Sequence, residues 1–175
     1  MKIVSVPNII TALRIAIIPP FLYSYLFIPT YGDNIALAIL IFSGITDVLD
    51  GFIARKFNQV TQIGTVLDPL ADKMFMISVL AVFTIKGEIG FWVLLIMALK
   101  ELLLIFGAYL LYADRGDIIP ANAFGKLSTI IFYIASLSIM LNVLAGHLLM
   151  IIFVLFNLAS LFIYCLRFMS IKKAI

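Results

Sequence analysis

The sequence predicts an all-α membrane protein, folded as an integral membrane bundle of six transmembrane helices. Of its 175 residues, 65% are hydrophobic, which is more apolar side chain than a soluble domain of this size can bury. Charged residues make up 12%, about half the share typical of soluble domains. The apolar residues form long unbroken runs instead of alternating with polar ones, and this pattern favours helices over a transmembrane barrel.

Each predicted helix corresponds to one apolar segment of roughly the 20 residues that a membrane span requires. The six segments are residues 8–30, 35–56, 66–86, 89–112, 124–145 and 148–168. Short polar breaks separate them, at residues 31–34, 55–64, 86–88, 114–120 and 146–147. Pro19 and Pro20 predict a kink within the first segment. Because no break is long enough to be an interdomain linker, residues 1–175 are expected to form a single membrane domain.

The distribution of basic residues predicts the orientation of this bundle. If both termini lie on one side, 11 of the 12 lysines and arginines lie on or nearest that side, and Lys86 alone lies on the other. Basic residues accumulate on the cytoplasmic side of membrane proteins, so both termini are expected in the cytoplasm and the protein in the inner (cytoplasmic) membrane. The net charge of +3 is too small to suggest a nucleic-acid partner.

Four of the nine acidic residues fall within a window of 26 residues. Asp47 and Asp50 are three residues apart near the end of the second segment, and Asp68 and Asp72 are four apart near the start of the third. Each spacing places its pair on one face of a helix. The short connection predicts that the two helices are antiparallel neighbours, so the four carboxylates should converge just below the cytoplasmic surface.

Four carboxylates this close repel one another unless cations are bound. Hard divalent cations with oxygen ligands meet this need, so the cluster predicts two Mg²⁺ or Mn²⁺ ions that could clamp a phosphoryl group for displacement. Gly51, Ala54 and Gly64 lack bulk and would let a ligand approach closely. Two alternatives stay open: the acids cap helices or pair with nearby basic residues, or they bind cations in a transporter. A transporter would more naturally place them at mid-bilayer depth within inverted repeats.

The spaced pattern of this region resembles the signature of the CDP-alcohol phosphotransferase family of integral membrane enzymes. The pattern is Asp47-x2-Asp50-Gly51-x2-Ala54-Arg55-x8-Gly64-x3-Asp68-x3-Asp72. The resemblance implies a donor that is a CDP-linked lipid, normally CDP-diacylglycerol, whose phosphate is attacked by an alcohol with release of CMP. It also implies that the four aspartates ligate two divalent ions and that Asp72 is the general base. Gly51, Ala54, Arg55 and Gly64 would form the CDP-lipid site, and a homodimer is expected.

The acceptor alcohol is less constrained by the sequence. The N-terminal pattern Pro7-Asn8-x2-Thr11-x2-Arg14 resembles the family branch whose acceptor is sn-glycerol 3-phosphate, but the branch that uses phosphatidylglycerol and makes cardiolipin shares much of it. An inositol-type acceptor is a third choice. Asn8 and Thr11 are predicted to contact the CDP-lipid. An anionic acceptor needs cations, and the candidates are Arg14, Lys73, Arg115 and Lys126, which could alternatively be interfacial anchors.

Overall fold

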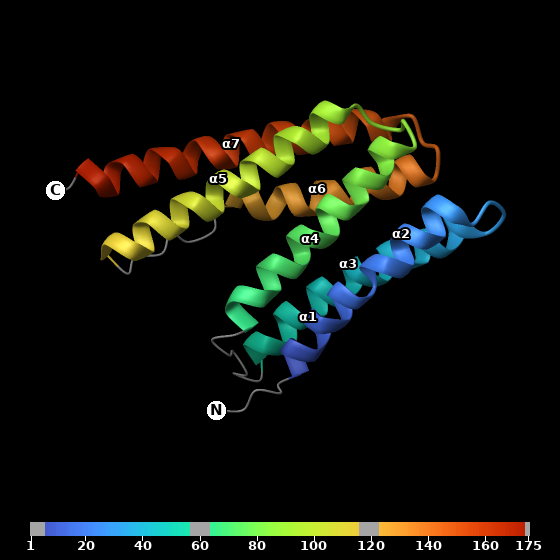
Figure 1. Cartoon of the computed structure of the whole chain (residues 1–175), viewed down its shortest axis with the longest axis horizontal. Coiled ribbons are helices and arrows are strands. Elements are labelled where there is room, and N and C mark those ends of the chain that lie inside the picture. Colours follow the sequence, from blue (N-terminus) through green and yellow to red (C-terminus); the bar gives the residue numbers. More distant parts are fainter. Residues whose placement is uncertain (1–5, 57–63, 116–122, 174–175) are drawn as a thin grey trace. The chain divides into compact units, whose positions relative to one another are not determined.

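The protein is described by a computed structural model that covers residues 6–56, 64–115 and 123–173, with side chains described for residues 11–47, 70–107 and 124–170. Within these ranges every regular element is a helix, which confirms the predicted all-α class (Figure 1). The helices are α1 (Val6–Ala16), α2 (Ile18–Phe27), α3 (Gly32–Lys56), α4 (Gly64–Ile85), α5 (Phe91–Arg115), α6 (Ala123–Met140) and α7 (Ala145–Lys173). The chain packs as two compact units, Met1–Glu88 and Ile89–Ile175.

The predicted kink in the first segment is present as a break between α1 and α2 at Ile17. Proline has no amide hydrogen, so Pro19 and Pro20 cannot donate to the carbonyl groups of Ile15 and Ala16, four residues earlier. The helix therefore restarts at Ile18, with a proline in its first turn, where the missing donor costs nothing.

The last turn of the chain lies earlier than predicted. The sequence suggests a break at Gly146 and His147, whereas these residues lie in the first turn of α7 and the reversal occupies residues 141–144. Asn142 allows this reversal because it adopts a left-handed backbone with φ of 55°. Gly146 is instead needed for packing, since a Cβ atom there would lie 2.7 Å from the backbone nitrogen of Ile139.

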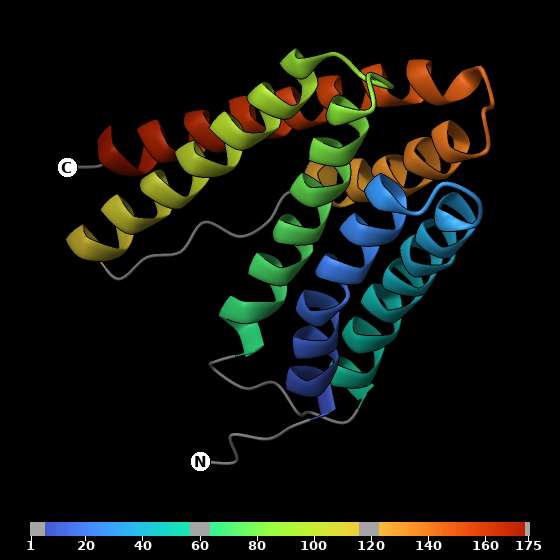
Figure 2. The same cartoon turned by 45° about the vertical axis from the view of Figure 1, so that its right-hand side comes forward.

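In the first unit, α1 and α2 are the central helices. Both pack against α3 and against α4, and Figure 2 shows α1 and α2 between these two helices. Buried aromatic rings form much of the contact: Phe21 lies 5.5 Å from Phe75, and Tyr25 lies 5.8 Å from Phe83, measured between ring centroids. The sequence suggested that α3 and α4 are direct neighbours, but in the described residues the packing runs through the helix that precedes them.

The two ends of this unit bring together different helix termini. The C-terminal end of α3, the N-terminal end of α4 and the N-terminal end of α1 lie together at one end (Figures 1 and 2). At the other end, the Tyr25 hydroxyl donates to Glu88 Oε1 at 2.7 Å, and Lys86 Nζ pairs with Asp33 Oδ1 at 2.8 Å. These contacts connect α2, α3 and the turn after α4 at the end remote from the predicted site.

In the second unit, α7 is the shared helix. It forms an antiparallel hairpin with α6, centred on Phe132 and Phe153 with ring centroids 5.4 Å apart, and it also packs on α5. Helices α5 and α7 run parallel to each other. Lys100 bonds Asn157 and Gly107 approaches Tyr164, and the residues of both pairs are 57 positions apart, as parallel helices require.

Among the described residues, one helix is long and apolar enough to cross a membrane, namely Ala145–Ser170 within α7. Two shorter apolar helices, Thr11–Phe27 and Phe124–Met140, accompany it. Large apolar side chains are exposed along α7, including Leu155 and Phe162, as suits a surface that faces lipid. The number of spans and the position of the termini remain predictions.

Candidate functional site

The acidic pattern predicted from the sequence lies on the C-terminal part of α3 and the N-terminal part of α4, which are at the same end of the first unit (Figure 2). Asp47 lies in the C-terminal half of α3 and Asp72 in the N-terminal half of α4. The backbones of the other pattern residues are helical, but their side chains lie outside the described residues. These residues are Asp50, Gly51, Ala54, Arg55, Gly64 and Asp68.

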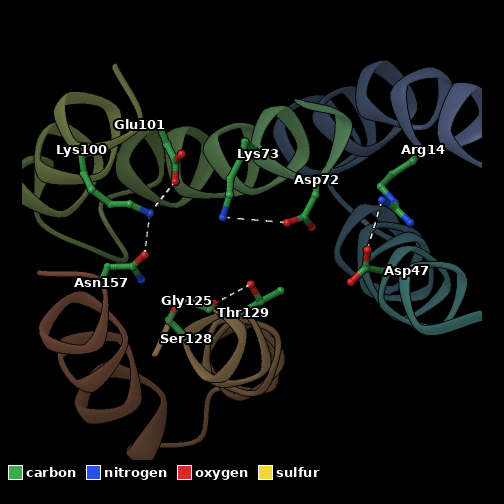
Figure 3. A network of polar contacts seen from close by, with 10 residues as sticks. All are labelled: Arg14, Asp47, Asp72, Lys73, Lys100, Glu101, Gly125, Ser128, Thr129 and Asn157. Carbon is green, nitrogen blue, oxygen red and sulfur yellow. Dashed lines mark hydrogen bonds and ion pairs between the residues drawn. The ribbon is translucent and has the colours of Figure 1, made fainter. Parts of the chain in front are cut away.

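Arg14 of α1 lies against Asp47. Its Nη1 atom is 3.2 Å from Asp47 Oδ1, and the two side chains are 1% and 31% exposed, respectively (Figure 3). Thr11, one turn earlier on α1, is also buried. Because α1 packs on both α3 and α4, it brings a buried cation and a hydroxyl to the helices that carry the acids. The side chain of Asn8 lies outside the described residues.

Asp72 has a looser ionic contact. Its Oδ2 atom is 4.0 Å from Lys73 Nζ, and its side chain is 16% exposed (Figure 3). An ion pair at this separation is weak where water reaches it. The carboxylate is thus mostly enclosed by protein but still reachable, which suits a group that must exchange a proton with a bound reactant.

The donor chemistry of the described acids fits magnesium or manganese. Carboxylate oxygens are hard ligands, which these ions prefer, whereas zinc sites normally contain histidine or cysteine. Among the described side chains, no group of three or more acidic, histidine or cysteine residues could hold a metal ion. Two of the four predicted ligands, Asp50 and Asp68, lie outside that set, so a two-metal site remains a prediction.

The candidate acceptor-binding cations have different surroundings. Lys126 is exposed and lies in the first turn of α6. A cation at a helix N-terminus is unfavourable for the helix dipole, so helix stability does not explain Lys126. The adjacent Gly125 carbonyl accepts a hydrogen bond from Ser128 Oγ at 2.8 Å (Figure 3). The side chain of Arg115, at the end of α5, lies outside the described residues.

The second unit contains a buried polar network that the sequence did not reveal. Lys100 Nζ lies 2.6 Å from Glu101 Oε1 and 2.9 Å from Asn157 Oδ1 (Figure 3). Asn157 Nδ2 in turn donates to the Phe153 carbonyl at 2.9 Å. Lys100 and Asn157 are 4% and 1% exposed, so the network links α5 to α7 through charged and amide groups inside an apolar contact. A polar residue within an apolar run was the available signal for Asn157.

Comparison with known proteins places this pattern in context. A family model described as CDP-alcohol phosphatidyltransferase matches residues 4–172. A protein of Mycobacterium tuberculosis whose name provisionally assigns it as a cardiolipin synthase is 33% identical over 141 residues, which are 81% of this chain and 66% of the relative. The chain therefore spans slightly less than two thirds of that protein's length.

Two relatives carry a different name, CDP-diacylglycerol–glycerol-3-phosphate 3-phosphatidyltransferase. The one from Bacillus subtilis is 34% identical over 137 residues, covering 71% of this chain and 70% of the relative. The one from Aquifex aeolicus is 32% identical over 142 residues, covering 79% and 78%. With the complete acidic pattern and a match over nearly its whole length, the chain belongs to the CDP-alcohol phosphatidyltransferase family.

Proposed function

We propose that the protein is a metal-dependent phosphatidylglycerophosphate synthase. It transfers the phosphatidyl group of CDP-diacylglycerol to sn-glycerol 3-phosphate and releases CMP. The observation that carries this proposal is the complete acidic pattern in the sequence, on the C-terminal part of α3 and the N-terminal part of α4, in a chain of this transferase family. The names of the Bacillus subtilis and Aquifex aeolicus relatives support the acceptor.

In the proposed reaction, the chain's own residues and two divalent ions would have separate roles. Asp47, Asp50, Asp68 and Asp72 would hold two Mg²⁺ or Mn²⁺ ions, which would supply electrostatic stabilisation of the phosphate charge. The acceptor oxygen forms a bond to the lipid-bearing phosphorus, and the bond from that phosphorus to the CMP oxygen breaks. Asp72 accepts the proton of the acceptor hydroxyl, for which its partly enclosed carboxylate is suited.

The remaining predicted residues bind the two substrates. Gly51, Ala54, Arg55 and Gly64 would form the CDP-lipid site together with Asn8 and Thr11 of α1. Lys126 and Arg115 would bind the acceptor phosphate, and the exposure of Lys126 at a helix N-terminus supports this role. The enzyme would work as a homodimer in the inner membrane, with its site facing the cytoplasm.

Cardiolipin synthesis is the second candidate, because the Mycobacterium tuberculosis relative carries that provisional name. In that case phosphatidylglycerol would replace sn-glycerol 3-phosphate. The donor, the leaving group and the acid site would be unchanged, so the two functions differ in the acceptor alone.

A panel of acceptors tests the proposal. The purified chain in phospholipid nanodiscs receives CDP-diacylglycerol, Mg²⁺ or Mn²⁺, and one of sn-glycerol 3-phosphate, phosphatidylglycerol or an inositol phosphate, and CMP release is measured. We expect turnover with sn-glycerol 3-phosphate and its loss with EDTA. Turnover with phosphatidylglycerol alone would establish the cardiolipin alternative, and metal-dependent ion flux without CMP release would contradict both.

A further inference from the structure

Arg14 has an environment that differs from that of an acceptor-binding cation. Its side chain is 1% exposed, whereas Lys126, another described candidate, on α6 of the second unit, is exposed. A soluble acceptor cannot bind a guanidinium that is enclosed by protein without displacing the groups that cover it. A buried charge requires a fixed partner, and the structure provides one in Asp47 at 3.2 Å.

The two side chains of this ion pair differ in exposure, which shows which of them faces the surface. Arg14 is buried, while the Asp47 side chain is 31% exposed. The guanidinium therefore lies on the protein side of the carboxylate, and the carboxylate extends toward the surface. The ion pair is formed through Asp47 Oδ1, and a carboxylate has about four lone-pair positions on its two oxygens. Contact with arginine from one side is thus compatible with ligation of a cation.

The packing of α1 fixes the position of Arg14 relative to Asp47. α1 packs on both α3 and α4, and Arg14 lies two residues before the end of α1, ahead of the break at Ile17. Arginine keeps its charge when buried, and its planar group fixes the geometry of a carboxylate partner better than lysine does.

We propose that Arg14 is a positioning residue, which holds the Asp47 carboxylate from its buried side in the orientation that a divalent cation requires. The inference rests on the proposed two-metal phosphatidyltransferase function. It assigns Arg14 to the support of a ligand instead of to the acceptor phosphate. Groups that orient metal ligands in this way typically contribute 10- to 100-fold to metal affinity or activity.

The sign of the change in metal affinity tests this role. Removal of a positive charge beside acidic residues would, by electrostatics alone, strengthen cation binding. Loss of a positioning contact would weaken it. In Arg14→Gln we therefore expect Mn²⁺ to bind about 10- to 100-fold more weakly, as measured from the free Mn²⁺ signal by electron paramagnetic resonance on the purified full chain.

Two further variants make the measurement specific. Arg14→Lys keeps the charge and should recover part of the affinity, which also covers the case in which Arg14→Gln does not fold. Arg167→Gln removes an arginine that is exposed on α7 and should leave Mn²⁺ binding unchanged. In CMP-release assays, Arg14→Gln should lower kcat with little change in the KM for sn-glycerol 3-phosphate.

The outcomes separate this inference from the proposed function. Unchanged or tighter Mn²⁺ binding in Arg14→Gln, or a raised KM for sn-glycerol 3-phosphate with an unchanged kcat, would overturn the role of Arg14. Absence of CMP release by the unmodified chain with every acceptor would overturn the proposed function, even if Arg14→Gln still weakened Mn²⁺ binding. Absence of Mn²⁺ binding by the unmodified chain would overturn the metal site itself.

Discussion

In the proposed function, a small number of polar residues carry the chemistry, in a chain of which 12% of residues are charged. The spacing of the four aspartates predicts a site, since three- and four-residue intervals place pairs on one helix face. The arginine partner of Asp47 could be found only in the structure. Arg14 pairs with Asp47 across two helices, and no sequence interval relates residues on helices that are not consecutive. The contact between Lys100 and Asn157 likewise joins two helices that are not consecutive, α5 and α7.

Asp72→Asn should abolish turnover while binding of CDP-diacylglycerol persists. The amide cannot accept the acceptor proton, and loss of a general base costs about 10²- to 10⁴-fold in rate. CMP release and equilibrium binding of the donor lipid measure the two effects. Asp33→Asn is a matched control at the far end of α3, where the carboxylate is 67% exposed, and it should leave turnover unchanged. Near-normal turnover of Asp72→Asn would exclude Asp72 as the base.

Lys100→Met should destabilise the protein because it removes the cation between Glu101 and Asn157. Loss of a buried hydrogen-bonding partner typically costs about 1–3 kcal/mol, measured as the free energy of unfolding in detergent. Lys126→Met makes the same substitution at an exposed site and should change that free energy by less than about 0.5 kcal/mol. Equal effects of the two substitutions would show that the buried network adds nothing to stability.

At the scale of helices, the sequence predicted where helices form better than it predicted which helices pack together. Apolar run length determines where a helix can lie, and each of the six predicted segments contains a helix in the described residues. Proline chemistry likewise predicted the break near Ile17. Which helix packs on which is determined by side-chain shape across the contact. The sequence therefore did not show that α1 and α2 contact both α3 and α4, or that Gly146 serves packing instead of a turn.

The parallel contact of α5 with α7 depends on Gly107. A Cβ atom at this position would lie 3.0 Å from Tyr164 Cε1, which is closer than side chains normally approach. Gly107→Val should therefore push the helices apart and lower the free energy of unfolding by about 1–3 kcal/mol.

Tyr164→Phe is the matched change on the opposite helix. The Tyr164 hydroxyl is buried and has no hydrogen-bond partner among the described residues, so its removal should leave stability unchanged or raise it slightly. Thermal unfolding in detergent, followed by circular dichroism, measures both variants. A stable Gly107→Val variant would show that the helices can separate here at no cost.

Orientation in the membrane is a property of the whole molecule, since it is determined by the basic residues summed over all connections. The count of 11 to 1 depends on sequence alone. Lys86, the one basic residue predicted on the non-cytoplasmic side, lies in the turn after α4 and pairs with Asp33 in the first turn of α3. This ion pair thus lies at the end of the first unit remote from the four aspartates of the predicted site.

Reporter fusions test the predicted orientation. Alkaline phosphatase fused after Ile175 should be inactive in a bacterial host, and green fluorescent protein at the same point should fluoresce, because both termini are predicted in the cytoplasm. Alkaline phosphatase inserted at Gly87 should be active. Active phosphatase at the C-terminus would reverse the predicted topology and place the acid site on the outer face.

The central place of α1 has a consequence for biosynthesis. The ribosome delivers α1 first, then α3 with Asp47, and α4 with Asp72 only afterwards, although α1 contacts both later helices in the finished fold. Chains grow at about 5–20 residues per second, so α1 waits for several seconds before its second partner exists. The proposed cation site is then completed in a single late step, and a nascent chain that stops before α4 cannot hold the full set of acids.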